Sequence, residues 1–333
     1  MERRKRFLGL GLIILLLCMP VFLGISQAKQ TIGMTGDFKN EYHMRSLTAA
    51  KDQAAIFGID AMMLDTKRDP GTEIRNIEQF IASKVNAIIA IHSNDSVYEL
   101  AIGKANQAKI PFVAFLDCPP KGDFIYAGSN YVQGAGGEIA AEALAKAMNY
   151  SGNIVYIRGT PGVIVSINRD KGLQAALKKY PKLKVVVELE GDWTRATGLK
   201  IMEDALAKYP QSAKNGGVSG VYAINDAMAL GAVRAIQTAG RKDIKVVGID
   251  GALDAIDAIQ AGTMTATAYQ NAEAQGVYAV VAAFRAMKGE KVPQFGFNIP
   301  WGLVTPETAA KFKQAQVGVN DALNFLIESA PVK

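Results

Sequence analysis

Residues 220–251 decide the fold and read GVYAINDAMALGAVRAIQTAG followed by RKDIKVVGIDG. A short apolar run predicts a buried strand over residues 221–224, which ends at the polar residue Asn225. Apolar residues then recur at helical spacing, and a second buried strand over 245–249 ends at Asp250. Parallel strands joined by a helix have their carboxyl ends at one edge of a sheet, where open α/β sheets bind ligands. We therefore expect Asn225 and Asp250 to meet in a binding site.

The same alternation of strand and helix extends through the rest of the chain. We expect strands over residues 31–35, 60–65, 87–91, 111–116, 153–157, 183–189, 264–268 and 298–304, with 124–128 beginning a connection. We expect helices before Gly58, over 72–83, up to about 109, after Asn130, and over 169–180, 197–208 and 274–288. Strands separated by helices imply parallel sheets, so the fold class is α/β. Two such series, with repeated crossings of the chain, indicate two lobes around a cleft.

The first 28 residues are typical of a cleavable signal peptide. Four consecutive basic residues, 3–6, precede an apolar core over 8–22, and the small residues Ser26 and Ala28 lie just before the expected cleavage position. A transmembrane anchor is the structural alternative, but Pro20 breaks the apolar core. Lipid attachment at Cys18 is a further alternative, which the large residue Leu17 disfavours. We expect an exported protein, periplasmic or otherwise extracytoplasmic.

Composition limits the remaining possibilities. Removal of the signal peptide takes four basic and one acidic residue from a net charge of +6, which leaves about +3 and gives no support for nucleic-acid binding. Cys118 is then the one remaining thiol, so no internal disulfide can form. A mature chain that begins near Lys29 is too long for one comfortable core, which favours two lobes.

Several stretches of the sequence carry a family resemblance that spans nearly the whole mature chain. The sequence resembles the ribose-type group of periplasmic sugar-binding proteins of ABC importers, that is, type I periplasmic binding proteins. The most specific stretches are AINDAMALGAVRAIQTAG, VVGIDG, IPFVAFLD and the run that begins at Arg169 with RDKGL.

The resemblance implies two doubly wound parallel-sheet lobes that close over one ligand about a three-strand hinge. The implied boundaries are 1–28 for the signal peptide, 29–129 with 271–299 for lobe one, and 130–270 with 300–333 for lobe two. The chain would cross between the lobes near Ser129, Gln270 and Pro300.

The resemblance also implies a set of ligand contacts on both lobes. The corresponding positions are Asn40, Tyr42, His43, Asp117, Arg169, Trp193, Asn225, Asp250 and Gln270. Carboxylates, amides and a guanidinium suit sugar hydroxyls, which both donate and accept hydrogen bonds. Tyr42 and Trp193, one from each lobe, would cover the two C–H faces of a sugar.

Several of these residues also have ordinary structural interpretations. Asn40 and His43 suit a helix start, where an Asn caps the helix and a His is exposed. Asp250 before a glycine suits a turn, Trp193 suits a core position, and Arg169 suits a solvated helix start.

One position departs from the family pattern and affects specificity. The family commonly has an arginine that contacts the sugar directly after the aspartate at Asp117, whereas this chain has Cys118 followed by two prolines. Loss of a guanidinium removes a bidentate donor, so the ligand need not be ribose. Whether Cys118 contacts the ligand or lies outside the cleft stays open at this stage.

The sequence gives little support for an enzyme. It contains no GxSxG, GxxxxGK[ST] or HExxH motif, and its two histidines are too few for a histidine-rich metal site. Paired acids such as Asp117 and Asp250 suit a glycosidase, but a sugar binder needs them too. A regulator with the same lobes would need a DNA-binding segment where the export signal lies.

We therefore expect a monomeric binder of a monosaccharide or polyol, without cofactor or metal, that delivers its ligand to an ABC permease. A sugar sensor for a chemoreceptor is the alternative, ahead of a carbohydrate-active enzyme.

Overall fold

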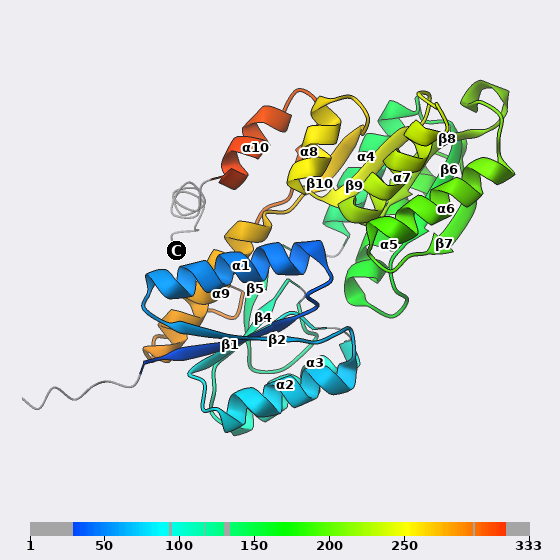
Figure 1. Cartoon of the computed structure of the whole chain (residues 1–333). Coiled ribbons are helices and arrows are strands. Elements are labelled where there is room, and N and C mark those ends of the chain that lie inside the picture. Colours follow the sequence, from blue (N-terminus) through cyan, green and yellow to red (C-terminus); the bar gives the residue numbers. More distant parts are fainter. Residues whose placement is uncertain (1–28, 93–94, 117, 130–133, 296, 318–333) are drawn as a thin grey trace, which may run out of the picture.

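The chain folds into two lobes, each built on a six-stranded sheet (Figure 1). The structure, a computed structural model, describes residues 29–92, 95–116, 118–129, 134–295 and 297–317. The expected signal peptide, the expected ligand contact Asp117 and residues 318–333 lie outside the described residues.

Lobe one contains the first sheet, in the spatial order β2-β1-β3-β4-β5-β11. Its strands are β1 (Thr31–Gly36), β2 (Asp60–Asp65), β3 (Ala87–Ala90), β4 (Phe112–Phe115), β5 (Ile125–Gly128) and β11 (Phe297–Asn298). All of its strand pairs are parallel. The order reverses at β1, which is the doubly wound arrangement with a topological switch point between β1 and β3.

Lobe two repeats this topology, in the order β7-β6-β8-β9-β10-β12. Its strands are β6 (Gly152–Arg158), β7 (Leu183–Glu190), β8 (Val218–Ala223), β9 (Lys245–Asp250), β10 (Ala266–Tyr269) and β12 (Gly302–Val304). Only the edge strand β12 runs antiparallel to its neighbour. The expected α/β class with two doubly wound parallel lobes is confirmed.

Helices cover both faces of each sheet. Lobe one has α1 (Glu41–Ile56) and α9 (Ala272–Met287) on one face and α2 (Pro70–Ala82) and α3 (Asp95–Gln107) on the other. Lobe two has α4 (Ala135–Ala147) and α5 (Ile164–Lys179) on one face. Its other face carries α6 (Arg195–Lys208), α7 (Asp226–Thr238) and α8 (Leu253–Gln260), with α10 (Ala309–Val317) beside α8. Each sheet is therefore buried from both sides.

The strand β3 shows why these segments lack polar residues. Ala87 and Ile89 pack under α1 and α9, whereas Ile88 and Ala90 pack under α2 and α3. Side chains alternate between the two faces of a strand, and both faces are covered here, so every position must be apolar.

The chain passes from one sheet to the other three times, after β5, after β10 and between β11 and β12. Two sequence predictions are corrected in these regions. Residues 124–128 were expected only to begin a connection, but they include the paired strand β5. The single strand expected over 298–304 is divided into β11 in lobe one and β12 in lobe two, because the prolyl residue Pro300 lies between them and lacks an N–H for a ladder.

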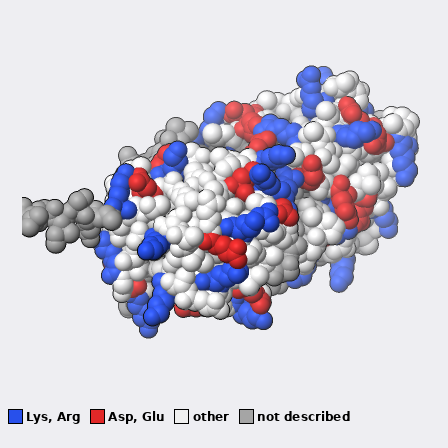
Figure 2. Space-filling view, turned by 60° about the horizontal axis from the view of Figure 1, so that its bottom comes forward, with Lys and Arg blue, Asp and Glu red and all other residues white. Residues whose placement is uncertain are grey.

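Two further properties of the described residues are the hydropathy of the helices and the distribution of surface charge. None of the described helices is both long enough and apolar enough to cross a membrane. On the face drawn in Figure 2, Lys and Arg side chains are interspersed with Asp and Glu over both lobes. No broad region of one charge covers the described part of that face.

Candidate ligand-binding site

A cavity of about 140 Å³ lies between the lobes, at the carboxyl ends of both sheets. Its lining residues come from the ends of strands and the loops that follow them, from the first turn of α1 and from the first two turns of α5. They are Asp37, Asn40, Tyr42, His43, Arg68, His92, Leu116, Thr160, Val163, Val165, Arg169, Trp193, Asp250 and Gln270. This is the edge at which doubly wound sheets bind ligands.

A buried ion pair forms the lobe-two side of the cavity. Arg169 Nη2 donates to Asp250 Oδ1 at 2.8 Å, and Gln270 Nε2 donates to the same oxygen at 2.8 Å. Arg169 Nη1 donates to the carbonyl oxygen of Ile224 at 2.6 Å, which ties the side chain to the end of β8. Burial raises the pKa of Asp250 from its ordinary value, and the charge of Arg169 opposes that rise.

The position of Arg169 differs from the sequence prediction. A helix start was expected there, but α5 begins at Ile164, so Arg169 lies in its second turn and is only 4% exposed. The interpretation as a solvated residue at a helix start is therefore wrong. The residue before the helix, Val163, is extended and supplies no side-chain cap. The sequence therefore lacks the polar residue that usually marks a helix start.

Four lining residues have left-handed backbone dihedrals, with φ of 57° at Arg68, 72° at Leu116, 69° at Trp193 and 125° at Asp250. None is a glycine, and such conformations cost about 1–3 kcal/mol each. Strain of this kind persists where the surrounding structure imposes it, and it is concentrated at functional sites. All four residues lie at the carboxyl ends of strands or in the loops that follow them, so the strain coincides with the cavity.

Lobe two also supplies an aromatic wall. Trp193 Nε1 donates to Thr160 Oγ1 at 2.9 Å, and Asn225 Nδ2 donates to the carbonyl oxygen of Trp193 at 3.1 Å. A Cβ atom at Gly159 would lie 2.6 Å from Trp193 Cζ2, so only glycine leaves room for the ring. The indole is thus held by Thr160 and by close contact with Gly159, while Asn225 holds the backbone of Trp193.

The lobe-one wall is organised by the first turn of α1. Asn40 Oδ1 accepts from the backbone N–H groups of Tyr42 at 3.0 Å and His43 at 3.2 Å, so its capping interpretation is confirmed. His43 Nδ1 accepts from the N–H of Asp37 at 3.2 Å. Burial lowers the pKa of His43 to about 4, against the opposing charge of Asp37, so the ring is neutral at pH 7.

The charges in the cavity cancel in pairs. Arg68 Nε donates to Asp37 Oδ2 on lobe one, as Arg169 does to Asp250 on lobe two. With His43 neutral, these described residues present hydrogen-bonding groups without a net charge.

Several buried polar atoms of the lining residues have no hydrogen-bond partner among the described residues. They are Tyr42 Oη, Arg68 Nη2, Arg169 Nε and Gln270 Oε1. Buried polar groups normally have partners, because an unsatisfied one costs about 1–3 kcal/mol. Residues that line the cavity from both lobes therefore hold buried donors and an acceptor without a protein partner.

The structure brings together seven of the residues predicted from the sequence. Asn40, Tyr42, His43, Arg169, Trp193, Asp250 and Gln270 line the cavity. It does not place Asn225 on the wall, since Oδ1 caps α7 by accepting from Met228 N at 3.0 Å and Nδ2 holds Trp193. Asn225 thus positions other residues.

Sequence reasoning missed seven lining residues, namely Asp37, Arg68, His92, Leu116, Thr160, Val163 and Val165. Asp37 and His92 follow buried strands, as Asp250 was expected to do, so the same sequence signal would have selected them. Arg68 lies in the turn between β2 and α2 and gives no such signal. Among the described residues, no group of three or more His, Cys, Asp or Glu side chains is arranged to hold a metal ion.

Comparison with known proteins agrees with this arrangement. A family model described as periplasmic binding protein domain matches residues 33–291. The ribose import binding protein RbsB of Salmonella typhimurium is 31% identical over 270 residues, which cover 80% of this chain and 88% of that protein. The D-apiose import binding protein of Paraburkholderia graminis is 30% identical over 86% of this chain and 90% of its own.

A solved structure gives the same result. A solute-binding protein of an ABC transporter from Bacillus halodurans with bound myo-inositol superposes with a TM-score of 0.78 and 28% identity, over 86% of this chain and 98% of its own. The fold, the inter-lobe cavity and these relatives define a type I solute-binding protein. The chain belongs to the periplasmic binding protein family and is ribose-binding-protein-like.

Proposed function

We propose that this protein captures a monosaccharide or related polyol between its lobes and delivers it to an ABC importer. The single observation that carries the proposal is the set of unpartnered buried polar atoms of residues that line the cavity: Tyr42 Oη, Arg68 Nη2, Arg169 Nε and Gln270 Oε1. A polyol offers hydroxyls that accept from the guanidinium nitrogens and donate to the amide oxygen. One small polyhydroxy molecule would therefore satisfy groups from both lobes.

The size and charge of the cavity support the same class of ligand. A volume of about 140 Å³ is small beside the roughly 300–1,000 Å³ of sites for drug-sized ligands, which favours a single sugar ring or short polyol. Paired charges favour a neutral ligand over a sugar acid or an amino sugar. Tyr42 and Trp193 supply apolar surface for C–H groups, as a sugar requires.

The route of delivery follows from the family and from the amino-terminal sequence. Export through a cleavable signal peptide over residues 1–28 would place the monomeric protein outside the cytoplasm, where an ABC permease would receive the ligand. A chemoreceptor that reads the closed form is the alternative partner. Residues 29–129 with 271–299, and 130–270 with 300–333, would move as the two rigid units.

A ligand screen on residues 29–333 tests the proposal. The panel contains D-ribose, D-apiose and myo-inositol, together with other pentoses, hexoses, their deoxy forms and polyols. At a hundred times Kd, a ligand that binds only the folded state stabilises it by about 2.7 kcal/mol, so at least one compound should raise the melting temperature clearly. Isothermal titration then gives the stoichiometry, which should be one. No upward shift across the panel would overturn the proposal, and hydrolysis of a glycoside by the pure protein would indicate an enzyme instead.

Closure is tested on the same samples. A ligand that contacts both lobes favours the closed form by its differential contacts. The radius of gyration from small-angle scattering should therefore fall when the best panel compound is added, and identical curves would mean that the lobes do not move.

A further inference from the structure

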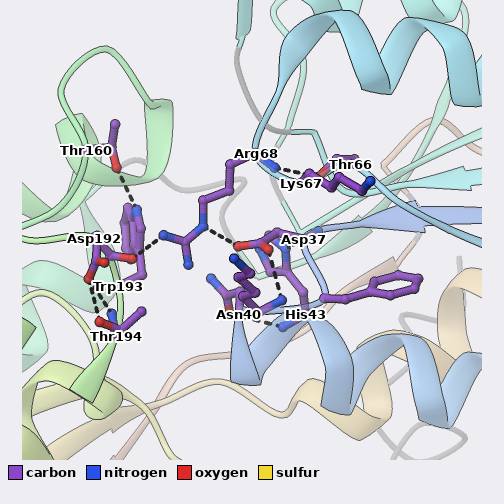
Figure 3. A network of polar contacts seen from close by, with 12 residues as sticks. Asp37, Asn40, His43, Thr66, Lys67, Arg68, Thr160, Asp192, Trp193 and Thr194 are labelled. Carbon is purple, nitrogen blue, oxygen red and sulfur yellow. Dashed lines mark hydrogen bonds and ion pairs between the residues drawn. The ribbon is translucent and has the colours of Figure 1, made fainter. Parts of the chain in front are cut away.

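Arg68 reaches across the cleft from lobe one, from the turn between β2 and α2. Lys67 and Arg68 both have left-handed backbone dihedrals, with φ of 54° and 57°. Asp65 Oδ1 accepts from the N–H of Lys67 at 2.9 Å and from the N–H of Phe38 at 3.1 Å, which fixes the turn against the loop after β1. The turn is thus held in a conformation that directs the Arg68 side chain at lobe two (Figure 3).

The three guanidinium nitrogens of Arg68 have three different environments. Nε donates to Asp37 Oδ2 on its own lobe, and Nη1 donates to the carbonyl oxygen of Asp192 on lobe two. Nη2 is buried and has no partner among the described residues. In Figure 3 this third nitrogen points into the space between Trp193 and the side chains of Asn40 and His43.

The lobe-two partner belongs to a loop that several hydrogen bonds hold to lobe two. The Asp192 carboxylate accepts from Thr194 N at 3.1 Å and from Thr194 Oγ1 at 2.6 Å, while Thr160 and Asn225 hold Trp193. The Asp192 carbonyl therefore moves with lobe two, and Asp37 moves with lobe one. A hydrogen bond from Arg68 to Asp192 can exist only when the lobes are close together.

From this geometry we infer that Arg68 is a specificity-determining residue that couples ligand contact to lobe closure. Nη2 donates to a hydroxyl or ring oxygen of the neutral polyhydroxy ligand, and Nη1 binds Asp192 in the closed form. The inference rests on the proposed function. Because Asp37 balances the charge of Arg68, the ligand oxygen does not need to be anionic.

This assignment has a direct consequence for selectivity. A ligand that lacks an oxygen opposite Nη2 leaves a buried charged donor without a partner, which costs more than a missing neutral hydrogen bond. Sites that hydrogen-bond a substrate hydroxyl reject the analogue without it much more strongly than apolar pockets reject a missing methylene. Arg68 thus makes one particular hydroxyl of the ligand obligatory.

Arg195 provides a matched control. It also joins the lobes, because it donates to Glu41 of α1 at 2.8 Å and 2.6 Å and pairs with Asp254 of its own lobe. It does not line the cavity, and its side chain is 43% exposed. Arg195→Ala therefore removes an inter-lobe contact without removing a ligand donor.

The experiment measures Kd by calorimetry and dissociation rates by stopped-flow tryptophan fluorescence, for the tightest-binding sugar of the panel and each of its monodeoxy forms. For wild type, one monodeoxy form should bind roughly 10- to 100-fold more weakly than the parent sugar through loss of the Arg68 contact. Arg68→Ala should bind the parent roughly 10- to 100-fold more weakly, mainly through faster dissociation, and should not discriminate against that monodeoxy form. Arg195→Ala should keep the full discrimination.

Each outcome decides the assignment. If Arg68→Ala retains the wild-type discrimination for every monodeoxy form, Arg68 does not contact the sugar and the assignment is overturned while the proposed function stands. If wild type binds no panel compound, both fail. Arg68→Lys, which keeps a charge beside Asp37 but lacks the second terminal nitrogen, should lose the same discrimination, and it replaces Arg68→Ala if that variant does not fold.

Discussion

The Arg169 guanidinium and the Asp250 carboxylate form an ion pair with an Nη2–Oδ1 distance of 2.8 Å, and the two residues are 4% and 7% exposed. A buried pair offsets its desolvation cost only when further hydrogen bonds satisfy both partners. Here the Ile224 carbonyl and the Gln270 amide supply them. The pair therefore belongs to the folded framework of lobe two as well as to the cavity wall.

Asp250→Ala is expected to reduce both ligand affinity and stability. It should weaken binding of the best panel sugar by about 2–4 kcal/mol, because polar partners are left unsatisfied. It should also lower the free energy of unfolding of the ligand-free protein by about 3–5 kcal/mol, because Arg169 stays buried without its counter-charge. Calorimetry and urea unfolding measure the two effects.

Arg285→Ala is the control for that experiment. Arg285 pairs with Glu290 at 2.7 Å, but both side chains are almost half exposed. Exposed pairs contribute about 0–1 kcal/mol, so this variant should change neither quantity much. An Asp250→Ala protein as stable as Arg285→Ala would show that the buried pair is not a framework element.

His43 should make the protein less stable in mild acid. Its pKa is about 4 in the folded protein and about 6.5 in an unfolded chain, so the unfolded state binds a proton that the folded state does not. Stability is retained above the unfolded pKa and falls by about 3 kcal/mol as the pH drops from 6.5 to 4. His43→Asn keeps an acceptor for the Asp37 N–H but does not titrate, so its unfolding free energy should fall less over this range. Parallel pH profiles for the two proteins would contradict the prediction.

Asp226 has the opposite dependence on pH. Burial and the nearby Asp250 charge raise its pKa to about 7, although Thr267 Oγ1 and Ala252 N donate to it, both at 2.7 Å. The folded state therefore holds a proton that the unfolded state releases, and stability is lost as the pH rises through 7. Asp226→Asn should gain up to about 4 kcal/mol over wild type between pH 4 and pH 8. Melting curves at these two values measure the gain, and an equal difference between variant and wild type at both would refute it.

The fold could be predicted because its signals are local. In β3 every position is buried and apolar, and in β9 the buried residues before Asp250 carry no polar side chain, while caps such as Asn225 and Asn271 mark the helix starts that follow strands. Short strands near the points where the chain crosses between the lobes were harder to predict, since a two-residue strand such as β11 is too short to show a hydrophobic period. Its pairing with β5 depends on tertiary contacts.

The candidate site could be predicted only in part, for a similar reason. Asp250 ends β9 and Gln270 follows β10, so the topology alone directs them to the cavity. Arg68 bonds to Asp192, 124 residues further along the chain, and nothing near Arg68 in the sequence indicates that contact. Asn225 has the right position for a ligand contact, but its amide is used by α7 and Trp193, which only the folded arrangement reveals.

Cys118 stands where the family commonly has a sugar-contacting arginine, and its position in the structure shows whether it can contact the ligand. The thiol packs against the apolar cluster under α2 and α3, its Sγ lies 3.5 Å from the carbonyl oxygen of Pro119, and it is not among the lining residues of the cavity. We therefore expect iodoacetamide to alkylate it at the same rate with and without the best panel sugar, because a ligand in the cavity would not cover it.

Cys118 is the one cysteine of residues 29–333, so intact mass reports its alkylation without ambiguity. Cys118→Ser is the control and should gain no mass, and it should bind the panel sugar with unchanged Kd because the side chain contributes to packing rather than to ligand contact. Slower alkylation of the wild type in the presence of sugar, together with a weaker Kd for Cys118→Ser, would instead place the thiol against the ligand. In that case the corner beside Cys118, rather than Arg68 alone, would select among sugars that differ by one hydroxyl.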